Sequence, residues 1–268
     1  MDAPSIYGWW LPPDLSAHGA VIDRLIIIMH VFMVVLFVGW GIFFIYCLVR
    51  FRQRPGHRAQ HEIPHSRLPK YLEVAVVVFE AVVLVGLSYP AWSKLRTAFP
   101  KKETSTNVRI VAQQFAWNIH YPGRDGVFGR LDPKLVSDSN PIGLDLNDAA
   151  AKDDVTTLNQ LHFPVDKPVV AELTSKDVIH SFFIPVLRVK QDAVPGMNIP
   201  IWWEATKTGQ FEIACAQLCG NGHTVMKGYV SIDTPEEYAT WMGEREKELT
   251  PPPADPATQP VAPEAAPQ

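Results

Sequence analysis

One uninterrupted apolar run most constrains what this chain can fold into. The stretch LIIIMHVFMVVLFVGWGIFFIYCLV, from Leu25 to Val49, contains no Asp, Glu, Lys or Arg. As an α-helix it would extend roughly 37 Å, enough to cross the hydrocarbon core of a bilayer with some tilt. A helix that is apolar all round belongs to a large protein core or to a membrane, and this length without charge favours the membrane. We interpret His30 as a contact with another helix or a partner, and Cys47 as a small apolar residue.

A second apolar run, YLEVAVVVFEAVVLVGLSYPAW, extends from Tyr71 to Trp92 and contains Glu73 and Glu80. Carboxylates at membrane depth are costly and usually face a partner helix, a cavity or a proton path. Their spacing of seven residues places both on roughly one helix face. Glu73 could instead lie among the lipid headgroups at the helix end, whereas Glu80 lies deeper. The two runs predict a transmembrane hairpin over residues 21–97, with helices at about 21–50 and 71–95.

The segment between the two runs is strongly basic, while the segment before the first run is not. Residues 50–70 contain only the acid Glu62 against the bases Arg50, Arg52, Arg54, Arg58, Arg67 and Lys70. The positive-inside rule therefore places the loop 51–70 in the cytoplasm, and the N-terminal segment 1–20 and the C-terminus on the outer face. The beginning MDAPSIYGWWLPPDL does not resemble a cleavable signal peptide, unless Met1 already follows a removed presequence.

From about Val108 the pattern changes to short stretches rich in β-branched and aromatic residues, separated by Pro, Gly and Asp. Six or more such stretches predict a β-sandwich or Greek-key barrel over residues 106–247. Residues 137–154 are acidic and polar, and we expect an exposed excursion there. A helix capped by Thr234 should follow the last strand. The Pro- and Ala-rich residues 248–268 predict a disordered tail, and the net charge of −4 gives no indication of nucleic-acid binding.

The segment CAQLCGNGHTVM, residues 215–226, gathers Cys215, Cys219, His223 and Met226. Two thiols, an imidazole and a thioether form a soft ligand set that suits copper. Zinc has little use for Met, and its structural sites commonly have C-x2-C spacing, not the C-x3-C spacing found here. A mononuclear copper site of the cupredoxin kind needs one Cys, so the second would be surplus. A disulfide between the two Cys would explain neither the His nor the Met.

Two Cys in one loop can instead bridge two metal ions through their sulfur atoms. Each ion then needs a terminal His, and the loop supplies only His223. The hypothesis therefore requires a second His from a different strand. The stretch DVIHSFFIP supplies His180 at the start of a predicted strand, 35 residues before Cys215.

With these motifs the chain resembles subunit II of the cytochrome c oxidases, the copper-containing subunit of haem–copper oxidases. The resemblance covers the hairpin, the outer domain, DVIHSFFIPVLRVKQDAVPGM (residues 177–197) and CAQLCGNGHTVM. It implies a membrane-anchored all-β protein in a bacterial inner membrane, with a periplasmic cupredoxin-like domain of the Greek-key barrel or sandwich type. It also implies a dinuclear copper centre (CuA) whose ligands would be His180, Cys215, Cys219, His223, Met226 and the backbone carbonyl of Gln217.

The resemblance further implies a function. Electrons from cytochrome c would pass to the copper centre and on to a haem in subunit I, where oxygen is reduced to water by a proton-translocating enzyme. The partners would be subunit I, the other oxidase subunits, cytochrome c and the membrane, with the oxygen site outside this chain. Asp177 and the acids of 137–154 are candidates for attracting a basic cytochrome, although such acids often form only a solvated face. Lys190 and Asp192 match family positions near the subunit I boundary.

Several residues depart from the family pattern. Gln217 stands where a Glu usually helps to hold magnesium, and an amide is a poorer magnesium ligand, which puts that site in doubt. Phe115, in QQFAWNIHY, stands where a surface Trp usually receives electrons, so electrons would enter through Phe115, Trp117 or another route. Glu73 corresponds to the family's Glu at the mouth of a proton channel. Glu80 replaces a usual Pro, and we expect no more of it than a carboxylate facing a partner.

Three other classes of protein share part of this pattern. Subunit II of a quinol oxidase has a similar fold but lacks the Cys pair. A membrane-anchored copper chaperone would not need the strand that contains His180. The copper domain of a nitrous-oxide reductase would accompany a large His-rich catalytic domain, which this sequence does not contain.

Overall fold

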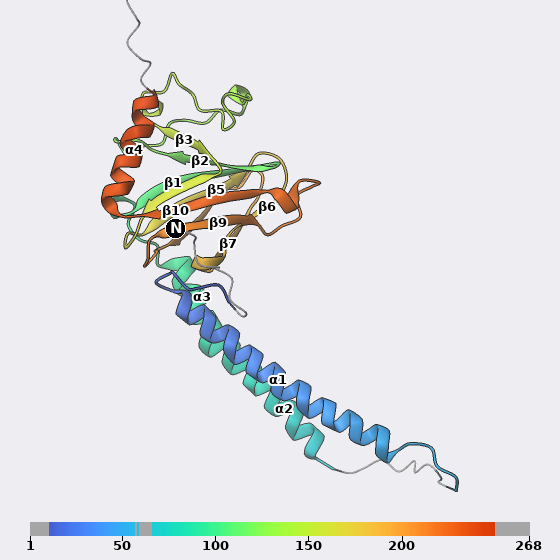
Figure 1. Ribbon diagram of the computed structural model, residues 1–268. Helices are drawn as coiled ribbons and strands as arrows, with labels where there is room; N and C mark the ends of the chain where they lie inside the picture. The colour runs from blue at the N-terminus through green and yellow to red at the C-terminus, as the bar shows by residue number, and fades with distance from the viewer. Residues whose placement is uncertain (1–10, 57, 59–65, 250–268) are drawn as a thin grey trace, which may run out of the picture.

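A computed structural model describes residues 11–56, 58 and 66–249 of the chain. In the described part, a long helical hairpin extends from a β domain (Figure 1). The predicted disordered tail falls almost entirely on residues 250–268, outside the described residues. The same holds for residues 1–10 of the N-terminal segment and for residues 57 and 59–65 of the basic loop.

The hairpin consists of α1 (Gly19–Arg50) and a second helix that lies beside it (Figure 1). This second helix is made of α2 (Leu68–Ala81), the π-helical segment η1 (Val82–Ser88) and α3 (Tyr89–Thr97), so it is longer than the predicted 71–95 and not α-helical throughout. Pro90, which has no backbone N–H to donate, is the second residue after the π-helical segment. By length and composition both helices could cross a membrane.

The β domain is a sandwich of two five-stranded sheets, ordered β3-β2-β1-β5-β8 and β4-β10-β9-β6-β7. β1 pairs in parallel with β5, and β10 with β4, while the other pairs are antiparallel. The strands are β1 (Thr106–Gln113), β2 (Ala116–Tyr121), β3 (Val155–Leu158), β4 (Gln160–Pro164), β5 (Val169–Ser175), β6 (His180–Ile184), β7 (Val189–Ala193), β8 (Ile199–Trp203), β9 (Gly209–Cys215) and β10 (Lys227–Asp233).

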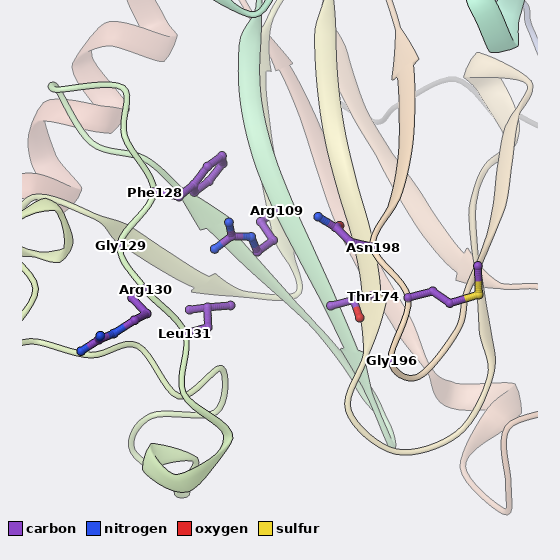
Figure 2. Close-up of a pocket in the computed structure, with 9 residues that line it drawn as sticks. Arg109, Phe128, Gly129, Arg130, Leu131, Thr174, Gly196 and Asn198 are labelled. Carbon is purple, nitrogen blue, oxygen red and sulfur yellow. The ribbon is translucent and has the colours of Figure 1, made fainter.

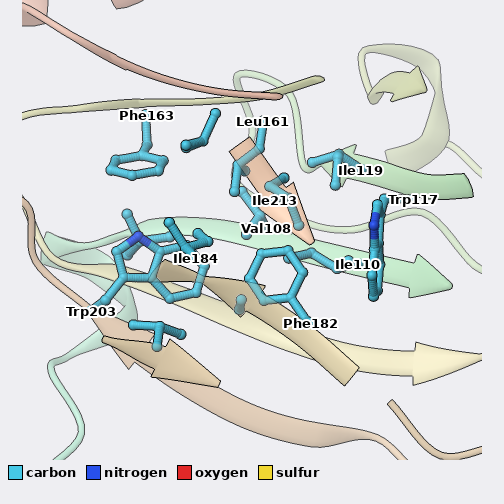
Figure 3. Packing of buried hydrophobic residues seen from close by; sticks show 14 of the residues in the cluster. Val108, Ile110, Trp117, Ile119, Leu161, Phe163, Phe182, Ile184, Trp203 and Ile213 are labelled. Carbon is cyan, nitrogen blue, oxygen red and sulfur yellow. The ribbon is translucent and has the colours of Figure 1, made fainter. Parts of the chain in front are cut away.

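Large aromatic side chains fill the space between the two sheets (Figure 3). Trp117, Phe182 and Trp203 are completely buried. The ring of Phe182 lies 5.4 Å from that of Trp117, edge to face, and 6.1 Å from that of Trp203. Alternate residues of β1, such as Val108 and Ile110, point into the same core and are also fully buried. These interlocked rings pack between the two sheets and support strands β6 and β9.

The acidic excursion 137–154, which lies between β2 and β3, is exposed only in part, although its composition predicts an exposed segment throughout. Ile142 and Leu144 are buried and pack with Val111 on the outer face of β1. His120 and Asp154, both fully buried at their side chains, form a pair with 2.6 Å between Nε2 and Oδ2. The prediction was wrong for the buried part because the few apolar residues of this stretch are enough to cover the sheet, and its acids bind backbone N–H groups and basic side chains.

The N-terminal segment ties the β domain to the hairpin. The backbone N–H of Leu15 donates to Val186 O at 2.9 Å, and Thr206 N–H donates to Leu15 O at 2.8 Å. Arg188 binds both carboxylate oxygens of Asp23 in α1, at 2.7 and 2.8 Å. The β domain is therefore attached to α1 through side chains as well as to α3 through the chain itself.

The last described helix, α4 (Pro235–Leu249), begins as the sequence predicts. The Thr234 hydroxyl accepts from Glu237 N–H and the Glu237 carboxylate accepts from Thr234 N–H, which forms a capping box. Trp241 of this helix stacks on His162, with 4.1 Å between ring centroids. His162 in turn lies 2.8 Å from the Asp233 carboxylate. The helix is thus held against β4 and the end of β10 by a stacked, paired histidine.

The ionisation of Asp233 makes the stability of the β domain depend on pH in the acid range. Burial by itself raises the pKa of Asp233, but hydrogen bonds from His162 and Ser231 outweigh this effect and lower the pKa. A carboxyl with a lowered folded-state pKa stabilises the fold above its unfolded value of about 3.9, and the contribution is lost as the pH falls below that value. We expect Asp233→Asn to reduce the loss of thermal stability between about pH 5 and pH 2. Melting curves with the exposed Asp138→Asn as control would test this; equal acid sensitivity of Asp233→Asn and the unmodified chain would contradict it.

Candidate metal centre

The loop that contains both Cys residues joins two neighbouring antiparallel strands. β9 ends at Cys215, the short helical turn η6 (His223–Val225) contains His223, and β10 begins directly after Met226. The turn is closed by backbone hydrogen bonds from His223 N–H to Gly220 O and from Met226 N–H to His223 O. Because both ends of the loop are fixed by paired strands, its side chains are held over one end of the sandwich.

The potential ligand atoms of this loop converge. The sulfur atoms of Cys215 and Cys219 lie 3.8 Å apart. The Cys219 sulfur lies 3.7 Å from His223 Nδ1 and 3.7 Å from the Met226 sulfur. On the other side, the Cys215 sulfur lies 3.2 Å from the backbone oxygen of Gln217. Two sulfur atoms thus lie at the centre, with nitrogen, oxygen and thioether donors around them.

His180 reaches the loop from another part of the chain. It is the first residue of β6, which pairs with β9 so that Phe182 lies opposite Cys215. Its Nδ1 lies 4.0 Å from the Cys215 sulfur. His180, Cys215 and Cys219 form a group whose ligand atoms all lie within 4.8 Å of one another, close enough to hold a metal ion. The pairing of β6 with β9 brings together residues that are 35 positions apart in the sequence.

Asp177 orients this histidine, a role that the sequence analysis missed. Its Oδ1 accepts from His180 Nε2 at 2.8 Å, which turns Nδ1 toward the sulfur atoms. Its Oδ2 accepts from Gln114 N–H at 2.6 Å. Burial raises the pKa of Asp177, but the hydrogen bonds from His180 and from backbone N–H groups lower it overall. The signal was present as Asp three residues before His, since metal-binding histidines usually donate their second N–H to a carboxylate or a carbonyl.

The Cys219 thiol is protected from water and holds its proton in the absence of metal. Cys219 and Met226 are buried, at 4% and 1% exposure. Burial, together with the neighbouring Cys215 thiol, raises the pKa of Cys219 to about 11. Metal binding at this loop would therefore release protons, because thiolates are the ligands. Two sulfurs flanked by two imidazoles, a thioether and a carbonyl oxygen fit a pair of copper ions, and the Met fits zinc poorly.

Phe115 and Gln114 hold the loop from outside. The Gln114 amide donates to Cys219 O at 2.6 Å. A Cβ added at Gly222 would lie 2.5 Å from the Phe115 ring, so the ring rests directly on the loop backbone at this glycine. Gly220, with φ of +137°, lies against the same ring and could not accept a side chain without strain. Phe115 is 37% exposed and therefore connects the protein surface with the metal loop.

The other residues singled out from the sequence lie in three places. Trp117 is fully buried, with its ring centroid 6.1 Å from that of His180, so it cannot touch a partner protein directly. Asp192 accepts from Ser181 Oγ at 2.6 Å, next to His180, and the Lys190 ammonium lies over the Phe183 ring. Glu73 and Glu80 are exposed on the hairpin, far along the chain from the metal loop.

A separate cavity of about 430 Å³ lies between residues 128–131, which precede the excursion, and the outer face of the first sheet (Figure 2). Arg109 forms one wall, with its guanidinium 4.5 Å from the Phe128 ring centroid and 3.7 Å from the Glu172 carboxylate. None of the residues that line this cavity is a candidate metal ligand. This cavity is therefore separate from the candidate metal centre.

The contact between Asp177 and His180 predicts a measurable effect. Asp177→Asn keeps the size of the side chain but removes the charge that orients and polarises the imidazole. We expect copper affinity to fall about 10- to 100-fold, the range found for the outer hydrogen-bond partners of metal ligands. Competition with a chelator would measure it, with Asp138→Asn as the control. An affinity equal to that of the unmodified chain would show that Asp177 does not position His180.

The chain is similar to known proteins over most of its length. The model of the family "Cytochrome C oxidase subunit II, periplasmic domain" matches residues 106–232. The alternative cytochrome c oxidase subunit 2 of Bradyrhizobium diazoefficiens is 34% identical over 236 residues, which cover 87% of this chain and 83% of that protein. Cytochrome c oxidase subunit 2 of Thermostichus vulcanus is 43% identical over 145 residues, which cover 54% of this chain and 35% of that protein. Among solved structures, the periplasmic domain of subunit II of cytochrome oxidase of Bradyrhizobium japonicum is 28% identical with a TM-score of 0.42, covering 56% of this chain and 99% of that chain.

Proposed function

The chain belongs to the cytochrome c oxidase subunit II family, and on that premise we propose that it receives electrons from cytochrome c at a dinuclear copper centre. The observation that carries the proposal is the pair of sulfur atoms 3.8 Å apart, with His180 brought in from a separate strand. The proposed ligands are His180, Cys215, Cys219, His223, Met226 and the backbone oxygen of Gln217.

The protein contributes a ligand cage that is rigid before the metal binds. When bound, the copper pair would supply one-electron transfer from cytochrome c toward the haem of subunit I. The paired strands β9, β10 and β6 hold the donors at fixed positions, so the cage does not rearrange when charge is gained or lost. The buried Cys219 and Met226 keep water away from the sulfur atoms. Asp177 fixes the orientation of His180, and Gln114 fixes the Cys219 carbonyl.

Phe115 is the best candidate for the position where electrons enter. It is the aromatic residue that both reaches the surface and touches the ligand loop at Gly222. Leu218 and Val225, 77% and 73% exposed, lie on the same loop and add apolar surface there. Exposed apolar groups around a site commonly mark a protein interface. Trp117 lies behind this surface, next to His180, and can serve only as an inner part of the path.

We infer the arrangement in the membrane from the hairpin and its loop. The two helices would cross the inner membrane of a bacterium, with the basic loop inside and the β domain in the periplasm. Subunit I and other oxidase subunits would surround the hairpin, and Glu73 would lie at the mouth of a proton channel. Gln217 presents an exposed neutral side chain, which is a poorer magnesium ligand than a carboxylate.

Copper loading of the purified full-length chain tests the proposal. We expect two copper ions per chain and, in the half-reduced state, a seven-line electron paramagnetic resonance pattern from one electron shared between two equivalent nuclei. A four-line pattern would indicate a mononuclear site and contradict the proposal. Copper that binds but gives neither the seven-line nor the four-line pattern would instead favour a chaperone or storage role.

A further inference from the structure

The cavity over the first sheet contains an arginine whose hydrogen-bond donors are not used. Arg109 projects from the outer face of β1 toward the Phe128 ring, and only 19% of its side chain is exposed (Figure 2). Its guanidinium lies 4.5 Å from the Phe128 ring centroid, and its Nε lies 3.7 Å from the Glu172 carboxylate, which is beyond hydrogen-bond distance. In the part of the chain that the structure describes, the Arg109 side chain donates no hydrogen bond, although it lines the cavity. The N–H donors of a largely buried guanidinium are therefore available to a molecule in this cavity.

Glu172, the acid beside this arginine, already accepts from other donors. Its Oε1 accepts from the Lys102 ammonium at 2.9 Å, and its Oε2 accepts from the Asn198 amide at 3.1 Å. Burial by itself raises the pKa of Glu172, but these hydrogen bonds and the charges of Lys102 and Arg109 outweigh burial and lower the pKa. The carboxylate is therefore ionised and held in place without a hydrogen bond from Arg109.

The charges around the cavity favour an anion with a single charge. Glu172 lies between Lys102 and Arg109, so two positive charges share one negative charge on the side of the sheet. At the rim, the Arg130 side chain is paired with Asp145 and has further acids around it. One positive charge is thus left over at Arg109, while the acids at the rim repel an anion that carries several charges.

The rest of the lining suits an apolar group. Phe128 and Leu131 contribute side chains from the 128–131 segment, and Met197 contributes one from the loop between β7 and β8. In Figure 2, Phe128 and Leu131 lie on one side of Arg109, and Thr174 lies on the other. The volume of about 430 Å³ is within the range of about 300–1,000 Å³ that is typical of small-molecule sites. The cavity therefore combines one unused cation with apolar walls.

We propose that this cavity binds a small organic molecule with a single carboxylate. The carboxylate accepts hydrogen bonds from the guanidinium of Arg109, and the apolar body of the molecule lies against Phe128, Leu131 and Met197. The planar guanidinium matches a carboxylate through two parallel N–H···O bonds, which makes this pairing selective. The inference goes beyond the proposed function, because the cavity shares no residue with the candidate metal centre.

Titration of the purified full-length chain with phenylacetate, followed by ligand-observed NMR, tests for this site. Phenylacetate combines one carboxylate with a small apolar body, so we expect a dissociation constant on the order of 1 mM. 2-Phenylethanol has the same ring without the charge and should bind at least about tenfold more weakly, because it cannot form the charged hydrogen bonds. Inorganic phosphate at the same concentration should not displace phenylacetate. Absence of phenylacetate binding at about 10 mM, equal binding of 2-phenylethanol, or displacement by phosphate would each overturn the proposal.

Variants compared in the same detergent locate the binding at Arg109. Arg109→Gln leaves the other donors of Glu172 in place, and we expect it to weaken phenylacetate binding at least about tenfold. The control Arg124→Gln, which removes an exposed arginine paired with Glu246 outside the cavity, should bind as the unmodified chain does.

Met197→Glu is a second test that leaves Arg109 intact. Met197 is 54% exposed, so the new carboxylate can be solvated, and its repulsion should weaken phenylacetate binding about three- to tenfold. Binding that is unchanged in Arg109→Gln would overturn the proposal. If that variant fails to fold, unchanged binding in Met197→Glu would overturn it instead.

Discussion

Replacement of Cys219 by serine should abolish cytochrome c oxidation while the oxidase complex still assembles. The Cys219 sulfur lies 3.8 Å from the Cys215 sulfur, 3.7 Å from His223 Nδ1 and 3.7 Å from the Met226 sulfur. It is therefore the ligand atom with three other potential ligand atoms around it. Serine keeps the shape but offers an oxygen that copper accepts poorly in place of a thiolate. We expect turnover to fall by more than the 10- to 100-fold loss that changes to outer hydrogen-bond partners cause.

The third cysteine provides the matched control for this experiment. Cys47 lies in α1, remote from the metal loop, and none of its neighbours along the chain is a candidate ligand. Cys47→Ser should therefore keep both copper and turnover. Assembly is read from the amount of subunit I that copurifies with each variant. Unchanged turnover in Cys219→Ser would show that the loop does not hold the electron-transfer centre.

Removal of the Asp154 carboxylate should have the largest effect on stability. Asp154 Oδ2 accepts from His120 Nε2 at 2.6 Å and from Gly129 N–H at 2.7 Å, and both side chains of the pair are completely buried. Asp154→Ala leaves the buried histidine and the Gly129 N–H without this acceptor. Breaking a buried pair by removing one partner typically costs about 3–5 kcal/mol. We expect a decrease of this size in the free energy of unfolding of the β domain.

Urea unfolding followed by tryptophan fluorescence measures this effect. The control is Asp138→Ala on the exposed part of the same excursion, which should change stability by no more than about 0.5 kcal/mol. His120→Ala and the double variant complete a cycle that isolates the energy of the pair. A loss below about 1 kcal/mol in Asp154→Ala would mean that the excursion contributes little to the fold.

Features that depend on neighbours in the sequence could be predicted without the structure. The absence of charge from Leu25 to Val49 predicted a long apolar helix, and the Thr234 and Glu237 pair predicted the start of α4; the structure confirms both. The C-x3-C loop indicated a soft metal site, since its residues lie within one turn. Such patterns are local: helix pitch, capping and ligand spacing within a loop follow from chemistry over a few residues.

Only the tertiary structure decided what depends on which strands pair. The sequence named His180 as the second histidine but could not place it in space; the pairing of β6 with β9 brings it to 4.0 Å from the Cys215 sulfur. The same pairing gives Asp177 its role as the acceptor from His180 Nε2. Composition likewise predicted an exposed excursion, whereas the structure buries Asp154 with His120. Burial and strand neighbours come from contacts between distant parts of the chain, which no local pattern of residues encodes.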